Sequence, residues 1–470
     1  MQASWVLAEN QKPGNTGWRI RGTSGPAIAG YADTTAATVG DTVRLFVSTT
    51  GRFHVEAYRM GYYGGDQARL VWRSRALTGR AQPPCPLTPA VNMISCRWAA
   101  SLSVSITSAW VPGDYLLKLI ADPGRQSYLP LTIWNPSSHA TYLVDNSVFT
   151  WQAWNPYGGY DMYGGAPPGQ TRQFAARARV MSYDRPYGYG DGAADFLGNE
   201  LPLVSFVEQH GLDVTYWTDI TFTEHPSLIL RHRVYLSLGH AECWSNPQRA
   251  AAVSGIAHGV NLVFFAASPI LRHVRAAPGQ DGAPDREMVD YRDERADPIL
   301  ASNPQEATGN TWAAPPANAP PSEITADTYG GYGLDDPLVV TDASAWPFAG
   351  TGLRDGSRLA HLVRFDFDFY DTAEPGPPNV QILAHSPVQP QQAIVGATHS
   401  DMTYYTASSG AAVIATGTNG WIGALTACPA GTLACPASLV QAITANILRV
   451  FGPGPAGRAH PAIPNWRRFY

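Results

Sequence analysis

The sequence has little lysine, no surplus of positive charge and no long hydrophobic run. Lys12 and Lys118 are the only lysines among 470 residues, and the formal net charge is −5 at pH 7. This balance gives no electrostatic reason to expect nucleic acid or an anionic membrane surface as a partner. No apolar stretch approaches the roughly 20 residues that a membrane-spanning helix requires. We therefore expect a globular protein whose partners are neither nucleic acids nor membranes.

Cysteine is also scarce, and its spacing matches no common zinc motif. The five cysteines comprise two close pairs, Cys85 with Cys96 and Cys428 with Cys435, and a single Cys243. Each close pair could form a disulfide, which favours an oxidising compartment. The first residues contain no basic segment and no long apolar segment of a signal peptide. We expect a secreted protein whose leader has been removed rather than a cytoplasmic one.

The chain is rich in glycine, proline and aromatic residues, which is typical of many strands joined by ordered loops. Apolar residues alternate with others around 43–47, 53–57 and 102–106. Short strands of this kind, separated by turn signals, predict an immunoglobulin-like β-sandwich domain over residues 1–135.

Residues 136–470 alternate strand signals with helix signals, which predicts an α/β domain with a mostly parallel sheet. The spacing of apolar residues predicts helices over 194–210 and 439–451. The polar, Pro- and Gly-rich stretch 278–321 is expected to be a long loop insertion within this domain.

Three groups able to titrate or bind metal follow the end of one predicted strand. The apolar run 234–238 is followed by a glycine and then by His240, Glu242 and Cys243, and a helix is predicted over 248–258. Open α/β sheets bind ligands at the carboxyl ends of their strands, so this segment is a candidate site. A carboxylate beside a helix start can equally stabilise the helix without any catalytic role.

The stretch WQAWNPYGGYDMYGG, residues 151–165, is unusually dense in aromatic residues and glycine. Flat apolar faces with a polar edge suit the wall of a binding pocket. A packed, glycine-kinked connector is the alternative interpretation. As a pocket wall, the stretch would contribute Trp151, Trp154 and Tyr160 to substrate binding. His399 of THSDMTYYT is assigned to the same pocket, and a structural hydrogen-bond pair with Asp401 is the alternative.

A series of stretches, in order along nearly the whole chain, carries a family resemblance. They are IAGYA (28–32), AYRMGYYGGD (57–66), GDYLL (113–117), TWQAWN (150–155), SYDRPY (182–187), YWTD (216–219), GHAECWS (239–245), AGTG (349–352) and YYT (404–406). Together they resemble proteins related to the large (beta) subunit of N,N-dimethylformamidase. The resemblance implies an immunoglobulin-like sandwich followed by an α/β domain related to class I glutamine amidotransferases. It also implies hydrolysis of a dialkyl formamide to an amine and formate.

The resemblance further implies a mononuclear Fe(III) ion held by two tyrosines and one glutamate, with a histidine nearby. Glu242 matches the glutamate and His240 the histidine, while Tyr115 in GDYLL is the match for the first tyrosine. The family's second tyrosine falls near Trp154, and tryptophan has no lone pair to give a metal. Tyr157 or Tyr160 could take the place of that tyrosine, and we assign Tyr157 as the second tyrosine ligand.

These residues suggest an iron-dependent hydrolase of a small or N-substituted amide. His240 would act as base or acid, and the partner would be a small-molecule amide. A small partner subunit or a homo-oligomer is compatible with the resemblance.

Two other functions remain open from the sequence. Cys243 could attack an amide directly with His240 as its base, since a helix start lowers a thiol pKa. A non-catalytic protein could instead bind carbohydrate or another partner on an aromatic platform formed by Trp151, Trp154, Tyr157, Tyr160 and Tyr163. Asp366 and Asp368 alternate with phenylalanines, which predicts a half-exposed strand rather than a site.

Overall fold

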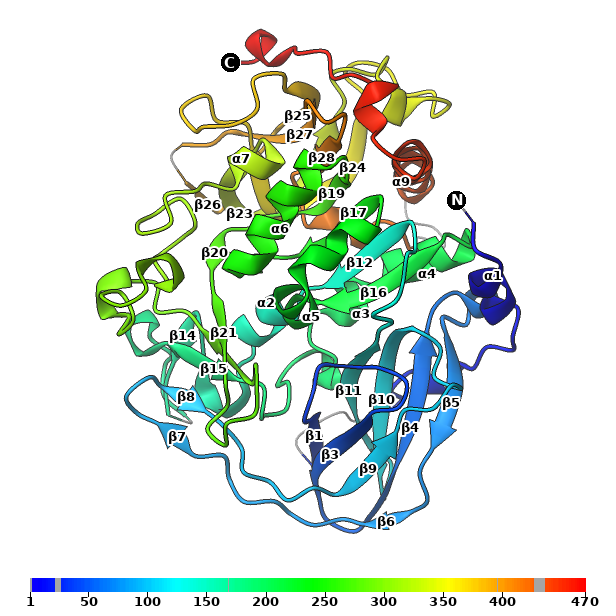
Figure 1. Ribbon diagram of the computed structural model, residues 1–470, viewed down its shortest axis with the longest axis vertical. Coiled ribbons are helices and arrows are strands. Elements are labelled where there is room, and N and C mark those ends of the chain that lie inside the picture. The colour runs from blue at the N-terminus through cyan, green and yellow to red at the C-terminus, as the bar shows by residue number, and fades with distance from the viewer. Residues whose placement is uncertain (1, 22–26, 168, 395, 427–435) are drawn as a thin grey trace.

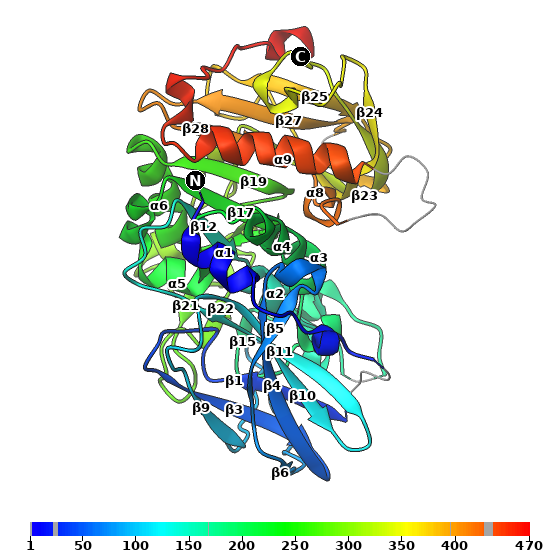
Figure 2. The same cartoon turned by 90° about the vertical axis from the view of Figure 1, so that its right-hand side faces the viewer.

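The computed structural model describes residues 2–21, 27–167, 169–394, 396–426 and 436–470. Most of the regular structure is β-strand, arranged in several sheets, and helices pack on the largest of them (Figure 1). The N-terminal sheets lie at one end of an elongated molecule, and the large sheet extends from its middle to the other end, where the C-terminal elements lie (Figure 2).

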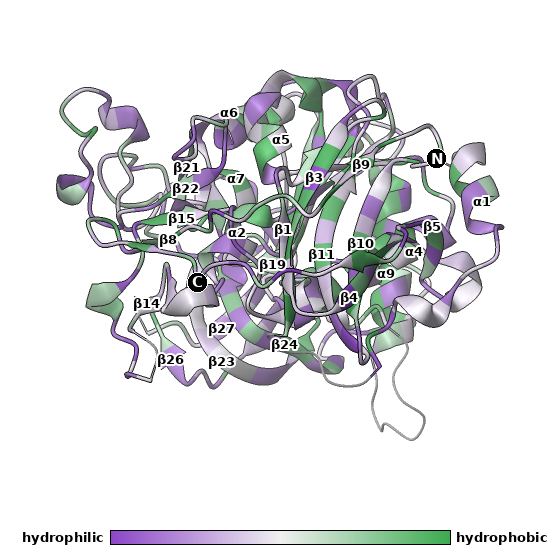
Figure 3. Ribbon diagram, turned by 90° about the horizontal axis from the view of Figure 1, so that it is seen from below, coloured by the Kyte–Doolittle hydropathy of each residue, from purple (hydrophilic) through white to green (hydrophobic). Residues whose placement is uncertain are grey.

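The N-terminal part forms two sheets that share one hydrophobic core. The smaller sheet consists of β1 (Ile28–Ala32), β3 (Thr42–Thr49) and β9 (Leu102–Ser105). The larger contains, in spatial order, β2 (Ala36–Ala37), β11 (Arg125–Ile133), β10 (Gly113–Ala121), β4 (Arg52–Met60) and β5 (Ala68–Arg73), with β6 (Leu77–Thr78) beside β4. Figure 3 shows apolar and polar residues alternating along these strands, as their period of two requires. The strands predicted around 43–47, 53–57 and 102–106 are confirmed.

The second part of the chain is built on a seven-stranded sheet. Its spatial order is β16 (Val214–Thr218), β12 (Tyr142–Asn146), β17 (Val234–His240), β19 (Asn261–Ala267), β28 (Ala412–Ala415), β27 (His399–Thr406) and β25 (Gln381–Pro387). The five strands from β16 to β28 run parallel, and β27 and β25 continue the sheet in antiparallel pairs. The predicted mostly parallel sheet is therefore present.

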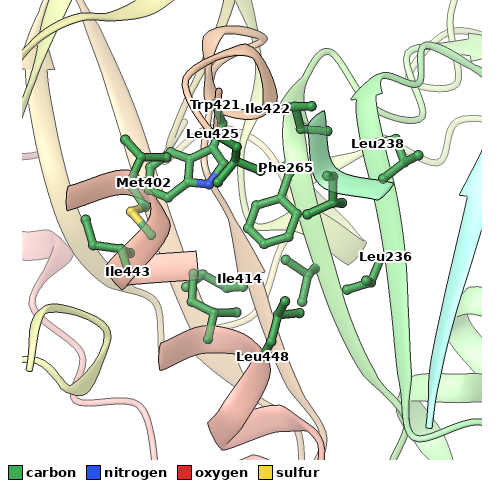
Figure 4. Close-up of a cluster of buried hydrophobic side chains, with 14 of the residues drawn as sticks. Leu236, Leu238, Phe265, Met402, Ile414, Trp421, Ile422, Leu425, Ile443 and Leu448 are labelled. Carbon is green, nitrogen blue, oxygen red and sulfur yellow. The ribbon is translucent and has the colours of Figure 1, made fainter. Parts of the chain in front are cut away.

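Hydrophobic side chains cover both faces of this sheet. On one face α4 (Leu201–Gln209), α8 (Gly420–Gly423) and α9 (Ala437–Phe451) contribute to a core with Leu236, Leu238 and Phe265 of the central strands (Figure 4). On the other face α5 (Asp219–Glu224) and α6 (Asn246–Ala257) pack over Tyr235 and Phe264. Successive residues of β17 enter opposite cores, which explains its continuous apolar run.

Two regions differ from the regular sheet. β23 (Thr328–Val339) and β24 (Arg358–Phe369) form a long antiparallel pair next to the large sheet. Residues 278–321 contain only β22 (Glu287–Val289) and short 3-10 turns, in keeping with the loop expected there. The helix predicted over 194–210 is two helices, α3 (Phe196–Asn199) and α4, which break at Glu200.

Cys85 and Cys96 form a disulfide, whereas Cys428 and Cys435 lie outside the described residues. Within the part of the chain that the structure describes, the helices are too short or too polar to span a membrane.

Candidate functional site

The site begins where β17 ends at His240, at the carboxyl edge of the parallel sheet. Gly239 precedes it with a φ of +23°, and an added Cβ there would lie 2.6 Å from the carbonyl oxygen of Asn199. Only glycine lets the strand end approach α3 this closely without strain. The chain then passes through Glu242 into β18 (Cys243–Trp244), and Ser245 caps α6. The predicted strand, polar segment and helix are all present.

The carboxylate of Glu242 is the centre of the site. Its side chain is buried, and Oε2 accepts hydrogen bonds from the indole Nε1 of Trp154 at 2.8 Å and from the hydroxyl of Tyr163 at 2.6 Å. The two aromatic rings stack with centroids 3.9 Å apart. Trp154 ends α2 (Val148–Ala153), and Tyr163 lies in the turn between β13 (Tyr160–Asp161) and β14 (Gly164–Gly165). The aromatic stretch therefore supplies both donors that fix Glu242.

His240 lies between two carboxylates. Its Nδ1 is 3.0 Å from Oδ2 of Asp195, and its Nε2 is 3.6 Å from Oε2 of Glu242. Burial alone would lower the pKa of His240, but Asp195 and Glu242 outweigh it and raise that pKa well above its usual value. Burial would raise the pKa of Glu242, but hydrogen bonding and charge from His240 lower it to about 2. The geometry fixes the orientation of the imidazole ring and leaves Nε2 facing the site.

Asp366 of β24 completes a cluster of possible metal ligands. One ligand atom each from His240, Glu242 and Asp366 lies within 4.8 Å of the others, and among the described residues no other such group of histidine, cysteine and carboxylate side chains occurs. Ser268 and Asn419 each place a donor 3.3 Å from Oδ2 of Asp366. Burial, followed by the charge of Glu242, raises the pKa of Asp366 to about 6. Two segments distant in the sequence, the end of β17 and β24, thus converge on one point.

Positive charge surrounds the aromatic side of the site. The guanidinium of Arg292 lies 5.3 Å from the ring centroid of Tyr163. Burial, followed by the charge of Glu242, raises the pKa of Tyr163 well above its usual value, while Arg272 acts in the opposite direction. Tyr163 is therefore a hydrogen-bond donor to Glu242 at neutral pH.

The proposed tyrosine ligands lie apart from Glu242. Tyr115 is buried between the N-terminal sheets, where its hydroxyl donates to the carbonyl of Val111 and its ring packs on Trp110. Tyr157 packs against the small cluster that contains Cys96. Neither side chain joins the group around Glu242.

The predicted substrate-binding residues are also divided. Trp154 contacts Glu242, but Trp151 is buried and donates its Nε1 hydrogen to Glu200. Tyr160 packs into the same core as Trp151. An aromatic platform of all five predicted residues is therefore not formed, because only Trp154 and Tyr163 stack as a pair at Glu242.

His399 belongs to a second cluster. It stacks on His385 with ring centroids 4.0 Å apart, and His385 is 2.7 Å from Asp401. Three strand steps separate β27 from β17, which corresponds to roughly 14 Å at the usual strand spacing. His399 is thus too far from Glu242 for both residues to contact the same small ligand.

Cys243 is buried, and its backbone N–H donates to Oγ1 of Thr150. Burial, together with the charge of Glu242, raises the pKa of the thiol well above its usual value. A helix start alone would lower it, but here desolvation dominates. This environment disfavours the thiolate that the nucleophile hypothesis requires.

Sequence reasoning missed Asp195 and Asp366 as site residues and gave Tyr163 only a stacking role. Asp195 approaches His240 from the start of α3, and Asp366 approaches from β24. No local pattern marks either residue, since both are far from the strand end in sequence. Tyr163 had a signal, because it belongs to the dense aromatic stretch.

The ferric centre that the family resemblance implies does not fit these residues. It requires two tyrosines and a glutamate, but the indole N–H of Trp154 donates to Glu242 and has no lone pair for a metal. Among the residues that the structure describes, Tyr163 is the one tyrosine that donates a hydrogen bond to Glu242. Tyr329 of β23 lies close enough for Asp366 and Glu242, after burial, to raise its pKa, yet it makes no hydrogen bond to Glu242. Among the histidine, cysteine and carboxylate side chains of the described residues, the donor set is His240, Glu242 and Asp366.

Comparison with known proteins gives one extensive match. The family model described as N,N-dimethylformamidase beta subunit-like, C-terminal, matches residues 54–433. No curated protein matches the chain.

Similar solved structures are distant. An uncharacterized protein from Bacillus anthracis str. Ames is 17% identical over 22% of this chain and 84% of its own, with a TM-score of 0.15. The RIG-5 IG1 homodimer is 14% identical over 22% of this chain and 97% of its own, with a TM-score of 0.13. A Paenibacillus sp. cycloisomaltooligosaccharide glucanotransferase is 9% identical over 80% of this chain and 69% of its own, with a TM-score of 0.20. These likenesses are too low to support an argument about fold or function.

Proposed function

Because this chain belongs to the N,N-dimethylformamidase beta subunit-like family, we propose that it hydrolyses the C–N bond of a small N-substituted amide at the site around Glu242. The observation that carries the proposal is the fixed arrangement of Glu242 and His240 at the carboxyl edge of the sheet. Trp154 and Tyr163 orient the carboxylate, while Asp195 orients the imidazole. Orientation of this kind is what a hydrolytic site needs, since catalysis depends on fixed geometry.

The proposed reaction consumes one water and releases an acid and an amine. The oxygen of water bonds to the carbonyl carbon, the C–N bond breaks, and the departing nitrogen takes a proton. His240 transfers this proton through Nε2, because Asp195 occupies Nδ1. The imidazole ring then takes up the proton that the attacking water loses, so the number of protons is the same before and after the reaction. Glu242 aligns Nε2 and the attacking water.

The wall of the proposed pocket favours an apolar N-substituent. The stacked rings of Trp154 and Tyr163 present a flat surface beside Glu242, and Trp154 is 37% exposed. Alkyl groups on nitrogen would cover this surface and remove apolar area from water. A small dialkyl amide suits the site better than a charged or extended peptide.

We assign no step to a ferric ion, because the two-tyrosine donor set is not assembled around Glu242.

At the level of fold, we propose that the N-terminal pair of sheets is an immunoglobulin-like domain and that the parallel sheet with its helices is related to class I glutamine amidotransferases. The five parallel strands covered on both faces support the second assignment. A small partner subunit or self-association is part of the proposal, since the family description refers to a beta subunit.

Product formation from N,N-dimethylformamide, N-methylformamide and N,N-dimethylacetamide, followed by NMR, tests the function. We expect amine and acid in equal amounts, and at least about 100-fold slower turnover for Glu242→Gln and for His240→Asn, in keeping with the usual effect of acid–base groups. Glu323→Gln and His258→Asn are matched controls, because both side chains are exposed and outside the site. Absence of turnover with every amide, or full activity of Glu242→Gln, would refute the proposal.

A separate variant distinguishes the cysteine mechanism. Cys243→Ser removes the thiol while keeping a side chain of similar size. We expect it to retain most of the activity, because the thiol is protonated and buried. Loss of activity in Cys243→Ser with Glu242→Gln still active would instead identify Cys243 as the nucleophile.

A further inference from the structure

The convergence of His240, Glu242 and Asp366 needs an explanation that the proton-transfer role of His240 does not give. Asp366 belongs to β24, outside the parallel sheet, yet its carboxylate lies within 4.8 Å of the other two groups. Glu242 and Asp366 are carboxylates with little exposure to solvent. Two like charges brought together away from water repel, and either a proton on one carboxylate or a cation between the two relieves this repulsion.

The nearby histidine does not balance this charge. His240 is shared between Asp195 and Glu242, so three carboxylates meet one imidazole. Arg272 offsets part of the charge of Glu242 and, to a smaller extent, of Asp366, but it also interacts with Tyr163, and Arg292 lies over the ring of Tyr163. A bound cation at the meeting point of the three ligand atoms would compensate the remaining negative charge.

Each of the three groups is also held by partners that orient it. Asp195 binds Nδ1 of His240, which fixes the ring and leaves Nε2 for a metal. Trp154 and Tyr163 both donate to Oε2 of Glu242, which leaves Oε1 for a metal. This layer of hydrogen bonds is typical of metal ligands, since outer partners set tautomer and orientation.

The oxygens of Asp366 are held in the same way by Ser268 and Asn419. Ligand atoms bound to one ion at about 2.1 Å lie at most about 4.2 Å apart, so the observed spacing needs only a slight contraction. The ligands therefore need no rearrangement of β17 or β24.

We propose that His240, Glu242 and Asp366 bind one first-row divalent cation, in place of the two-tyrosine ferric centre. One imidazole and two carboxylates suit Zn²⁺, Mn²⁺ or Fe²⁺. Asp366 supplies the anionic oxygen that is lost where tryptophan occupies position 154. The inference rests on the proposed function for its catalytic meaning. With Nε2 of His240 bound to the ion, water bound to the same ion would take over the proton transfer otherwise assigned to His240, because such an ion polarises a carbonyl and lowers the pKa of bound water.

Metal binding can be measured without turnover. Protein freed of metal by a chelator is titrated with Zn²⁺ by calorimetry and with Mn²⁺ by electron paramagnetic resonance. We expect one ion per chain, and at least about 100-fold weaker binding for Asp366→Asn and Glu242→Gln, since loss even of outer partners weakens binding 10- to 100-fold. Asp335→Asn on the paired strand β23 is the matched control and should bind as the parent does, because its carboxylate is exposed.

Several results would overturn the metal proposal. They are no binding of Zn²⁺, Mn²⁺ or Fe²⁺ to the parent protein, unchanged binding in Asp366→Asn, or purified protein with one Fe(III) and a visible tyrosinate band that Tyr163→Phe or Tyr329→Phe removes. Circular dichroism of metal-free Asp366→Asn separates weak binding from misfolding. Binding without amide turnover would reject the proposed function alone, and turnover in a protein that binds none of the three ions would reject the metal proposal alone.

Discussion

The orientation of the Glu242 carboxylate is fixed by the hydrogen bonds that its neighbours donate. Trp154 and Tyr163 hold one oxygen of this carboxylate, and both come from a loop that is more than 70 residues earlier in the chain. The sequence could identify His240 and Glu242, since they follow directly from a predicted strand. It could not identify Asp195 and Asp366, because their placement depends on how α3 and β24 pack against that strand.

The bond from Tyr163 to Glu242 predicts a specific loss on mutation. Tyr163→Phe removes a hydrogen bond to a buried carboxylate, which is usually worth about 1.5–3 kcal/mol. We expect kcat/KM for the amide to fall about 10- to 100-fold while the fold stays intact. Tyr332→Phe, at an exposed tyrosine of β23, should leave kcat/KM unchanged. Equal activity of the two variants would show that the hydroxyl of Tyr163 does not contribute to catalysis.

Asp114 predicts how stability depends on pH. Its side chain is buried, Oδ1 accepts hydrogen bonds from Asn146 and Thr132, and Oδ2 has no partner among the described residues. Burial raises its pKa to about 7, above the unfolded value of about 3.9. The folded chain therefore holds this proton more tightly, and the stability it gives below about pH 4 is lost as pH rises towards 7.

Asp114→Asn should flatten this dependence. Between pH 5 and pH 7 the parent should lose up to about 3 kcal/mol more free energy of unfolding than the variant, at about 1.4 kcal/mol per pH unit. Urea denaturation at the two pH values measures the difference. A parallel decline in both proteins would show that Asp114 titrates normally.

At the scale of elements, Gly239 determines how β17 delivers His240 to the site. Gly239→Ala places a Cβ 2.6 Å from the carbonyl of Asn199 at a positive φ. We expect a loss of about 1–3 kcal/mol in the free energy of unfolding, since strain of this kind has that magnitude. Activity should fall as well, because the end of β17 must move. Thermal unfolding and kcat/KM measure the two effects.

Gly198→Ala is the matched control for that strand end. Gly198 lies in α3, and an added Cβ meets nothing within 4 Å. Alanine is the better helix former, so this variant should be as stable as the parent or slightly more stable. If Gly239→Ala and Gly198→Ala have the same stability and the same kcat/KM, glycine is not required at the end of β17.

The break between α3 and α4 shows why element boundaries were harder to predict than elements. Apolar spacing over 194–210 predicted one helix, and both parts of it are helical. Pro202 lies in the first turn of α4, where its missing N–H is tolerated, and it would break the interior of one continuous helix. The carboxylate of Glu200 at the break also accepts hydrogen bonds from Ser147 and Trp151, which local spacing does not show. By contrast, α9 depends on its own apolar stripe and was predicted within two residues at each end.

At the scale of the whole molecule, a buried ion pair joins the N-terminal sheets to the large sheet. Arg59 of β4 donates to both oxygens of Glu208 in α4, at 2.8 Å and 2.6 Å, and neither side chain is exposed. Tyr216 and Asn10 donate to the same carboxylate. The sequence predicted the two parts and their order, but no local pattern could show that they share this network.

Removal of one partner from this network should destabilise the protein strongly. Glu208→Ala leaves the guanidinium of Arg59 buried without its counter-charge, which usually costs about 3–5 kcal/mol. Glu294→Ala, which breaks a surface pair with Arg295, should cost less than about 1 kcal/mol. Chemical denaturation gives both values. A small effect of Glu208→Ala would mean that the two parts are held together mainly by apolar packing.

The claim that joins fold, site and function is that Glu242 lies at the centre of a hydrolytic cation site. Anomalous diffraction from crystals grown with Zn²⁺ tests it most directly. The account predicts one strong peak about 2.0–2.2 Å from ligand atoms of His240, Glu242 and Asp366. No peak at the carboxyl end of β17, or a peak bound by tyrosines without Asp366, would contradict the account.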